Sequence, residues 1–336
     1  MRIAILHPAI TCIDSPDEQD ILVQADTVSE TLVTLGHTPV DLACTLDLNR
    51  LKCDLAALKP DLVFNLVESL DGRGCMIHLV PFLLDALQTP YTGCGAEAVL
   101  VTSNKTLAKD RLAIAGLPTP AWLGAFPSSL PPLSLPQVAN KHSRWIVKSV
   151  WEHASIGLDE TAEFVFDCSD IAVAKLKKLS SRFGGACFAE SFIEGREFNL
   201  SLLGGPGGPE VLSPAEILFE GYPAEALRIV GYRAKWDESS YEFHHTPRRF
   251  DFPPQDAGLI EQLRQLALKC WKVFGLKGYA RVDFRVDEDG YAWILEINTN
   301  PCLSPDAGFA AALKAAGLPY TQAIERILLD TLNSGH

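Results

Sequence analysis

The segment of residues 281–298 constrains this chain most, because it predicts a β-hairpin with one unusual polar face. Asp289-Gly290 lies between two runs of alternating residues, and this dipeptide is typical of a two-residue type I′ turn. Such a turn places Asp283 opposite Glu296. Since side chains alternate faces along a strand, one face of the hairpin is expected to be apolar and to join the core. That face consists of Val282, Phe284, Val286, Trp293, Leu295 and Ile297.

The other face of this hairpin is polar and carries Arg281, Asp283, Arg285, Glu296 and Asn298. Asp283 and Glu296 are expected about 4.5–5.5 Å apart at Cβ, where two carboxylates repel unless a cation lies between them. With Asn298 they form a hard oxygen site suited to Mg²⁺, and Arg281 beside them offers a fork of donors for an oxyanion or phosphate. Spacing alone is also compatible with a solvated face carrying ordinary salt bridges.

Composition limits the class of protein. The chain has 336 residues, enough for two or three domains, and 42 acidic against 29 basic residues, a formal charge of −13. This charge argues against nucleic-acid binding. The nine cysteines are scattered without a Cys-x-x-Cys pair, which indicates a reducing compartment, and we expect the cytoplasm. The start MRIAILHPAI indicates a first strand rather than a signal peptide, and no apolar run is long enough to span a membrane.

Residues 1–100 predict an α/β domain with a parallel sheet, because strand-like and helix-like runs alternate. The expected strands are residues 2–6, 40–43 and 62–66, and the expected helices are 20–36 and 75–87. No Gly-x-Gly-x-x-Gly follows the first strand, so a dinucleotide site is not expected there.

Two smaller α+β units are expected to follow, residues 101–190 and 191–336. The first has helices at 104–116 and 171–183, a proline-rich connector at 118–136, and strands at 145–148 and 186–192. The second has a strand at 197–203, helices at 259–274 and 319–329, and the hairpin. Residues 232–247 form a long polar segment, typical of a lid or binding loop.

Several motifs resemble those of one enzyme family. Gly278-Tyr-Ala-Arg-Val-Asp283, followed by Leu295-Glu-Ile-Asn-Thr-Asn-Pro301, resembles the C-terminal signature of ATP-grasp enzymes, and most closely the D-alanine–D-alanine ligase branch. Further matches occur in family order at residues 90–105, 146–157, 189–198 and 232–236. The resemblance covers about residues 60–330. It implies an ATP-grasp fold, in which an N-terminal parallel-sheet domain precedes two α+β subdomains that clamp the nucleotide.

The resemblance also implies nucleotide-binding roles. Lys105 and Lys148 would hold the α- and β-phosphates, and Lys235 the γ-phosphate. Glu190 and the backbone near Ile193 would bind adenine, and Glu197 the ribose. Asp283, Glu296 and Asn298 would bind two Mg²⁺ ions, with Mn²⁺ as a substitute.

On the substrate side, the resemblance implies that Arg281 would stabilise the tetrahedral intermediate and that Ser304 would contact a carboxylate. Ser155 lies in the loop over the phosphates, and Glu18 would anchor the first amino group. Residues 232–247 correspond to the mobile ω-loop, which would keep water from an acyl phosphate. Family members often form homodimers.

Other positions depart from the family pattern, and they fall on the amino-acid side. Glu68 follows the third expected strand where the family has a His-Gly pair, which favours a cationic or amine-bearing group. Ala154, Trp236 and Cys302 replace a serine, a tyrosine and a glycine of the family. ATP chemistry is therefore better supported than D-alanine as the substrate.

The sequence thus predicts an ATP-dependent ligase that joins a carboxylate to an amine, both from small molecules such as amino acids. D-alanyl-D-alanine is one candidate product, and another dipeptide or a modified amino acid is another. An ATP-grasp kinase acting on a small polyol would keep the same lysines and metal ligands. A nucleotide-binding protein without turnover is the third hypothesis, although it would not need a complete metal site.

Overall fold

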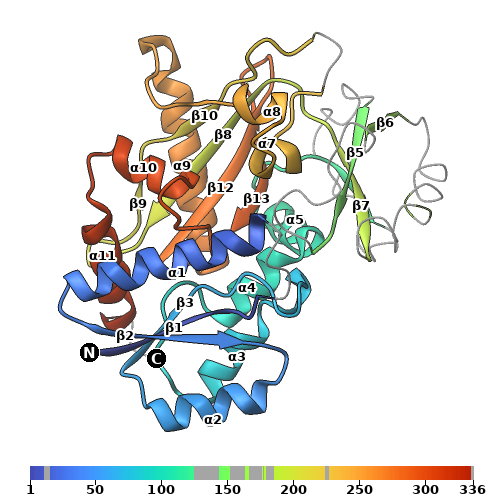
Figure 1. Ribbon diagram of the computed structural model, residues 1–336. Helices are drawn as coiled ribbons and strands as arrows, with labels where there is room; N and C mark the ends of the chain where they lie inside the picture. Colours follow the sequence, from blue (N-terminus) through green and yellow to red (C-terminus); the bar gives the residue numbers. More distant parts are fainter. Residues whose placement is uncertain are drawn as a thin grey trace.

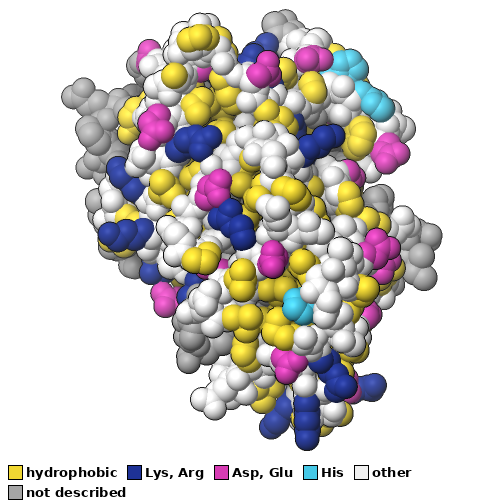
Figure 2. Space-filling view, turned by 90° about the vertical axis from the view of Figure 1, so that its left-hand side faces the viewer, with side chains coloured by type: hydrophobic (Ala, Val, Ile, Leu, Met, Phe, Trp, Pro, Cys, Tyr) yellow, Lys and Arg dark blue, Asp and Glu magenta, His cyan; other side chains and the backbone are white. Residues whose placement is uncertain are grey.

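The computed structural model describes residues 1–10, 16–124, 144–151, 163–165, 176, 178, 185–223 and 227–333, with backbone only for 16–18 and 163–165. The strands among these residues form three sheets, which lie in separate parts of the molecule in Figure 1. No helix among these residues is both long and apolar enough to cross a membrane. On the face shown in Figure 2, acidic and basic side chains are interspersed with hydrophobic ones.

The N-terminal sheet is parallel, in the order β2-β1-β3. Its strands are β1 (Arg2–Pro8), β2 (Thr38–Cys44) and β3 (Leu62–Asn65). The connections are α1 (Pro16–Thr34) and α2 (Leu48–Leu58), and β3 is followed by the 3₁₀ helix η1 (Gly74–Met76) and α3 (Leu79–Ala86). The predicted parallel sheet is confirmed. The helix expected at 75–87 is divided between η1 and α3, and α2 was not predicted.

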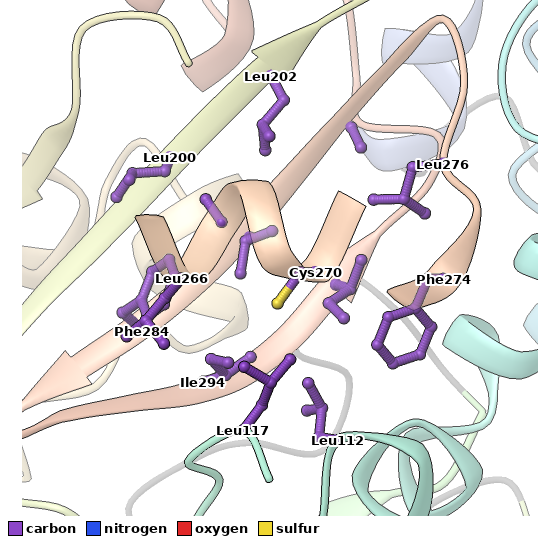
Figure 3. Close-up of a cluster of buried hydrophobic side chains, with 14 of the residues drawn as sticks. Leu112, Leu117, Leu200, Leu202, Leu266, Cys270, Phe274, Leu276, Phe284 and Ile294 are labelled. Carbon is purple, nitrogen blue, oxygen red and sulfur yellow. The ribbon is translucent and has the colours of Figure 1, made fainter. Parts of the chain in front are cut away.

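The largest sheet has the order β11-β10-β8-β12-β13, and β9 also pairs with β8. Its strands are β8 (Arg196–Leu203), β9 (Glu210–Val211), β10 (Ala215–Ile217), β11 (Arg248–Arg249), β12 (Tyr279–Val286) and β13 (Ala292–Asn298). After the 3₁₀ helix η4 (Pro254–Asp256), α9 (Ala257–Phe274) covers one face of this sheet. Figure 3 shows Leu266, Cys270 and Phe274 of α9 among strand residues such as Phe284.

The third sheet is small and antiparallel, in the order β4-β7-β5-β6. Its strands are β4 (Trp122–Gly124), β5 (Arg144–Ser149), β6 (Glu163–Val165) and β7 (Cys187–Ser191). The strands expected at 145–148 and 186–192 are therefore confirmed. The predicted helix at 171–183 lies outside the described residues except for positions 176 and 178, as does most of the proline-rich connector.

Helices α4 (Ala96–Ser103) and α5 (Lys105–Ile114) connect the small sheet to the rest of the molecule. The Asn104 side chain caps α5 by accepting hydrogen bonds from two backbone amides, those of Thr106 and Leu107, both at 3.1 Å. Leu112 and Leu117 then pack against α9 in the cluster of Figure 3. This cap and packing fix the first residue of α5, Lys105, relative to the largest sheet.

A second hydrophobic cluster joins the N-terminal sheet to the C-terminal helices α10 (Gly308–Ala315) and α11 (Tyr320–Asn333). It contains Ile3 and Phe64 from the sheet together with Phe309 and Ile324 from the helices, all fully buried. The chain also approaches itself closely at Gly278 (φ +64°), where a Cβ would lie 2.9 Å from the backbone of Gly93. The two ends of the chain thus share one core.

The hairpin β12–β13 confirms the predicted pairing but not the predicted turn. Arg281 pairs with Asn298, and Asp283 with Glu296. The loop, however, has three residues: the amide of Gly290 donates to Asp287 O at 3.0 Å, and the amide of Asp287 donates to Tyr291 O at 3.1 Å. Gly290 has φ +79° and Asp289 does not have a positive φ, so a type I′ turn, which needs both, is wrong. A bulge beside Asp283/Phe284 compensates for the extra loop residue.

The bulge also corrects the predicted core face on β13. Between the loop and the bulge, Ala292 and Ile294 join the core cluster, whereas Trp293 pairs with Arg285 on the other face. The Trp293 indole donates to Asp287 Oδ2 at 3.0 Å. Trp293 is buried, as predicted, but on that other face. Leu295 is half-buried and was wrongly placed in the core.

Candidate active site

Four cations from four different elements surround Glu296. Lys105 begins α5, Lys148 lies on β5, Lys235 lies on α7 (Tyr232–Trp236), and Arg281 lies on β12. Burial alone would raise the pKa of Glu296, but these four cations outweigh it and lower that pKa. The structure thus brings together residues that are far apart in the sequence and that were predicted to bind phosphates.

Asp283 is held by two neighbours. Arg281 Nε donates to Oδ1 at 2.7 Å and Nη2 to Oδ2 at 2.9 Å, while Asn199 Nδ2 donates to Oδ1 at 2.8 Å. Burial raises the pKa of Asp283, and Arg281 opposes that shift. Asn199 was not predicted as a site residue. It lies opposite Asp283 because β8 pairs with β12. The signal in the sequence was a polar residue within the alternating run 197–203.

The oxygen donors at this hairpin fit a hard divalent cation. Asp283 and Glu296 are opposed, and Asn298 follows two residues later on the same strand, with its Oδ1 accepting from the Asn300 amide at 3.0 Å. Among the described residues, no group of three or more His, Cys, Asp or Glu side chains is arranged to hold a metal by itself. Two carboxylates and an amide would therefore need water and phosphate oxygens to complete the shell, as is usual for Mg²⁺.

Glu190 on β7 lies between two lysines. Its Oε1 is 2.7 Å from Lys148 Nζ, and its Oε2 forms an ion pair with Lys109. Burial raises the pKa of Glu190, but the two cations together lower it. The structure places the Glu190 carboxylate toward Lys148, which was predicted to bind phosphate. The adenine role of Glu190 stays a prediction. Lys109 was not predicted, although its spacing of four residues from Lys105 on an expected helix indicated a shared face.

The segment after β7 contains the predicted hinge residues. Ile193 is buried, and the Glu197 carboxylate pairs with Arg285 at 2.8 Å. Arg285 lies near the rings of Phe192 and Phe219, 5.5 Å from each centroid, and donates to Gly195 O at 3.2 Å. Burial raises the pKa of Glu197 and Arg285 opposes it. The adenine and ribose roles of Ile193 and Glu197 stay predictions.

Residues 232–247 are more ordered than the sequence indicated. They form two short helices, α7 and α8 (Tyr241–His244), and the Ser240 side chain caps α8 by accepting from the Phe243 amide at 3.1 Å. Burial lowers the pKa of Lys235, and Glu296 is the largest opposing charge. Helix α7 thus carries Lys235 to the carboxylates of the hairpin.

A second polar group lies beside Arg281, between α1 and the loop after β13. Gln24 Nε2 donates to Glu68 Oε1 at 3.3 Å, and Cys302 Sγ donates to Asp20 Oδ2 at 3.0 Å. Burial raises the pKa of Glu68 to about 7. The charge of Asp20 also raises this pKa, whereas the charge of Arg281 lowers it. Ser304, predicted to contact a carboxylate, is fully buried beside Cys302, at 3.2 Å from its sulfur.

Two predicted residues cannot be compared with the structure. Ser155 lies outside the described residues, and Glu18 lies in α1 where only the backbone is described. Their roles in the phosphate loop and at the first amino group stay predictions.

The fold and this arrangement of lysines and acids define an ATP-grasp protein. The family model described as "D-ala D-ala ligase C-terminus" matches residues 115–329. The D-alanine–D-alanine ligase of Aquifex aeolicus is 30% identical over 94% of this chain and 96% of its own length, and that of Synechococcus sp. is 30% identical over 79% and 75%. The chain belongs to the D-alanine–D-alanine ligase family.

Solved structures agree with this fold. The D-alanine–D-alanine ligase of Bacillus anthracis complexed with ATP superposes with a TM-score of 0.72 at 19% identity, covering 99% of this chain and 98% of that one. The enzyme of Coxiella burnetii gives 0.69 at 18% identity, covering 100% and 94%. The predicted fold class is confirmed, and so is the predicted enzyme class, an ATP-dependent carbon–nitrogen ligase.

Proposed function

We propose that this ligase uses ATP to phosphorylate the carboxylate of one amino acid and joins the resulting acyl group to the amine of a second. The observation that carries the proposal is the convergence of Lys105, Lys148, Lys235 and Arg281 on Glu296, directly opposite Asp283. With Glu190, Glu197 and their partners Lys109 and Arg285 included, six cations face four carboxylates, so the site has the positive surplus that a triphosphate requires. Phosphoryl transfer depends mainly on such charge neutralisation and alignment.

The side chains divide this work. The three lysines bind and align the phosphates, and Asp283, Glu296 and Asn298 hold Mg²⁺, which neutralises charge on the transferred phosphoryl group when it is bound. Arg281 presents its fork to the oxyanion that forms when the amine attacks the acyl phosphate. Since Asp283 already accepts two bonds from Arg281, metal and substrate binding would redistribute these contacts.

Helices α7 and α8 support the proposed exclusion of water. Lys235 extends from α7 toward Glu296, so contact with the γ-phosphate would draw this segment over the nucleotide. A closed segment would protect the acyl phosphate from hydrolysis. Binding of phosphate and closure of the segment would then depend on the same lysine.

D-alanine is the first candidate substrate because the relatives are D-alanine–D-alanine ligases. The acids beside Arg281 suit an amino acid: Glu68 and Asp20 face its ammonium group, while Arg281 faces its carboxylate. These acids also suit an additional amine on the substrate. A cytoplasmic location, a homodimer, and the absence of nucleic-acid and membrane partners stay predictions.

The test is ATP turnover across a panel of D- and L-amino acids, including diamino acids, with ADP and free phosphate measured separately. The proposal expects ADP and phosphate in equal amounts, together with a new amide detected by mass spectrometry, only when an amino acid is present. ADP formed with phosphate retained on the acceptor would instead show a kinase. ATP binding without turnover on the whole panel would contradict the ligase proposal.

A further inference from the structure

Lys109 is a buried cation that the proposed chemistry does not use. Its side chain is 1% exposed, and it lies one helical turn after Lys105 on α5. Its Nζ donates to Thr119 Oγ1 at 2.8 Å and pairs with Glu190 Oε2, and it lies 5.9 Å from the centroid of the Trp122 ring. Burial lowers the pKa of Lys109, and Glu190 opposes that shift. A charge buried this completely requires a partner.

Glu190 connects this buried lysine to the phosphate-binding lysine. One carboxylate oxygen contacts Lys109, and the other contacts Lys148 at 2.7 Å, while the carboxylate itself is 2% exposed. Lys148 is more exposed, at 15%, and faces Glu296 and Glu197 as well. A single buried carboxylate is therefore shared between a structural cation and a functional one.

We propose that Lys109 is a positioning residue for ATP binding: by neutralising Glu190 from the buried side, it leaves Lys148 oriented but not tightly held. When phosphate arrives, Lys148 can leave Glu190 without stranding an unpaired buried carboxylate, because Lys109 remains paired with it. Without Lys109, Glu190 would have Lys148 as its partner and would compete with phosphate for it. This role rests on the proposed function, since it requires Lys148 to bind a nucleotide phosphate.

The role predicts a specific pattern of nucleotide affinity. Lys109→Met removes the charge but keeps much of the volume, and we expect the Kd for ATP with Mg²⁺ to rise about tenfold or more, since truncating one partner of a buried charge pair has effects of at least this size. The KM for ATP should rise to match, while kcat changes less than about threefold. In Lys109→Met/Glu190→Gln the competing carboxylate is gone, and the affinity should recover at least about threefold over that of Lys109→Met.

The experiment is calorimetric titration of the whole protein with ATP and Mg²⁺, alongside steady-state kinetics. Lys109→Arg keeps the charge and should bind ATP within about threefold of wild type. Tyr91→Phe, which removes the partly buried hydrogen bond from Tyr91 to Asp85 at 2.8 Å, controls for a general loss of stability and should leave the Kd unchanged.

Two results overturn the role of Lys109: normal ATP affinity in Lys109→Met, or a double variant that binds no better than Lys109→Met. If Lys109→Met does not fold, the Arg variant decides the question, since weak ATP binding by Lys109→Arg contradicts the proposal. Failure of the wild-type protein to bind ATP would instead overturn the proposed function, and the positioning role with it.

Discussion

Arg281 holds both carboxylate oxygens of Asp283, at 2.7 and 2.9 Å, although only one residue separates the two along β12. The pair lies on the polar face of the hairpin, where the proposed metal and oxyanion sites meet. An arginine in a two-pronged contact is not interchangeable with lysine, because lysine lacks the planar fork.

We therefore expect Arg281→Lys to lower kcat by about 10²–10³-fold while changing the KM for ATP much less. The charge remains for the phosphates, but the second donor to the oxyanion is lost. Steady-state kinetics with varied ATP and varied amino acid measure both quantities. An equal loss in kcat and in ATP affinity would assign Arg281 to nucleotide binding instead.

Glu296→Gln should lower turnover at least about a thousandfold, because an amide cannot replace the carboxylate in binding a metal among four cations. The cations also lower the pKa of Glu296 below its usual value of 4.5, so its ionised form stabilises the fold above that pH. The variant should unfold at a slightly lower temperature without nucleotide but keep the same circular dichroism spectrum. Activity near that of the wild type would refute the metal assignment.

Glu68→Gln should stabilise the protein at high pH but not at low pH. The pKa of Glu68 is about 7 in the fold against 4.5 as the ordinary value. Ionising it therefore costs stability progressively from about pH 4.5 to 7 and fully above pH 7. At roughly 1.4 kcal/mol per pKa unit the upper limit is about 3 kcal/mol, and partial exposure reduces it.

Thermal unfolding at pH 4.5 and pH 8 measures this difference, with Glu288→Gln on the exposed hairpin loop as the control. The gain from Glu68→Gln should be larger at pH 8. An equal gain at both values would contradict the burial of the Glu68 charge.

Gly195→Ala should disturb the segment that follows β7. Gly195 has φ +133°, and a Cβ there would lie 2.0 Å from Val286 O. Relieving this overlap must move the backbone that positions Ile193 and Glu197, at a cost of about 2–4 kcal/mol. Gly207→Ala, with no atom within 4 Å of the added Cβ, should stay within about 1 kcal/mol of wild type. Thermal unfolding and ATP titration of both variants test the comparison.

The sequence was most informative where acidic and basic residues occur within an alternating, strand-like pattern. The pairing of Asp283 with Glu296 followed from alternation and a turn signal, yet the turn was wrong and the pairing survived because a bulge offset the longer loop. Residue types do not reveal a bulge, so the buried Trp293 was assigned to the wrong face of the hairpin and the half-buried Leu295 to the core. A one-residue error in register reverses every side chain until something compensates it.

Tertiary contacts account for the residues that were missed. Asn199 and Lys109 matter through partners far away in the sequence, Asp283 and Glu190. No local sequence pattern indicates that Asn199 contacts Asp283 or that Lys109 contacts Glu190. Helices α7 and α8 were expected as an irregular segment because each is only about one turn long, too short for helical periodicity to show.

The cluster that unites Ile3 and Phe64 with Phe309 and Ile324 makes the first and last parts of the chain one folding unit. Neither part can complete its interior until the ribosome has released nearly all of the polypeptide. A truncation that removes α11 would therefore expose the N-terminal sheet to aggregation, far from the residues deleted.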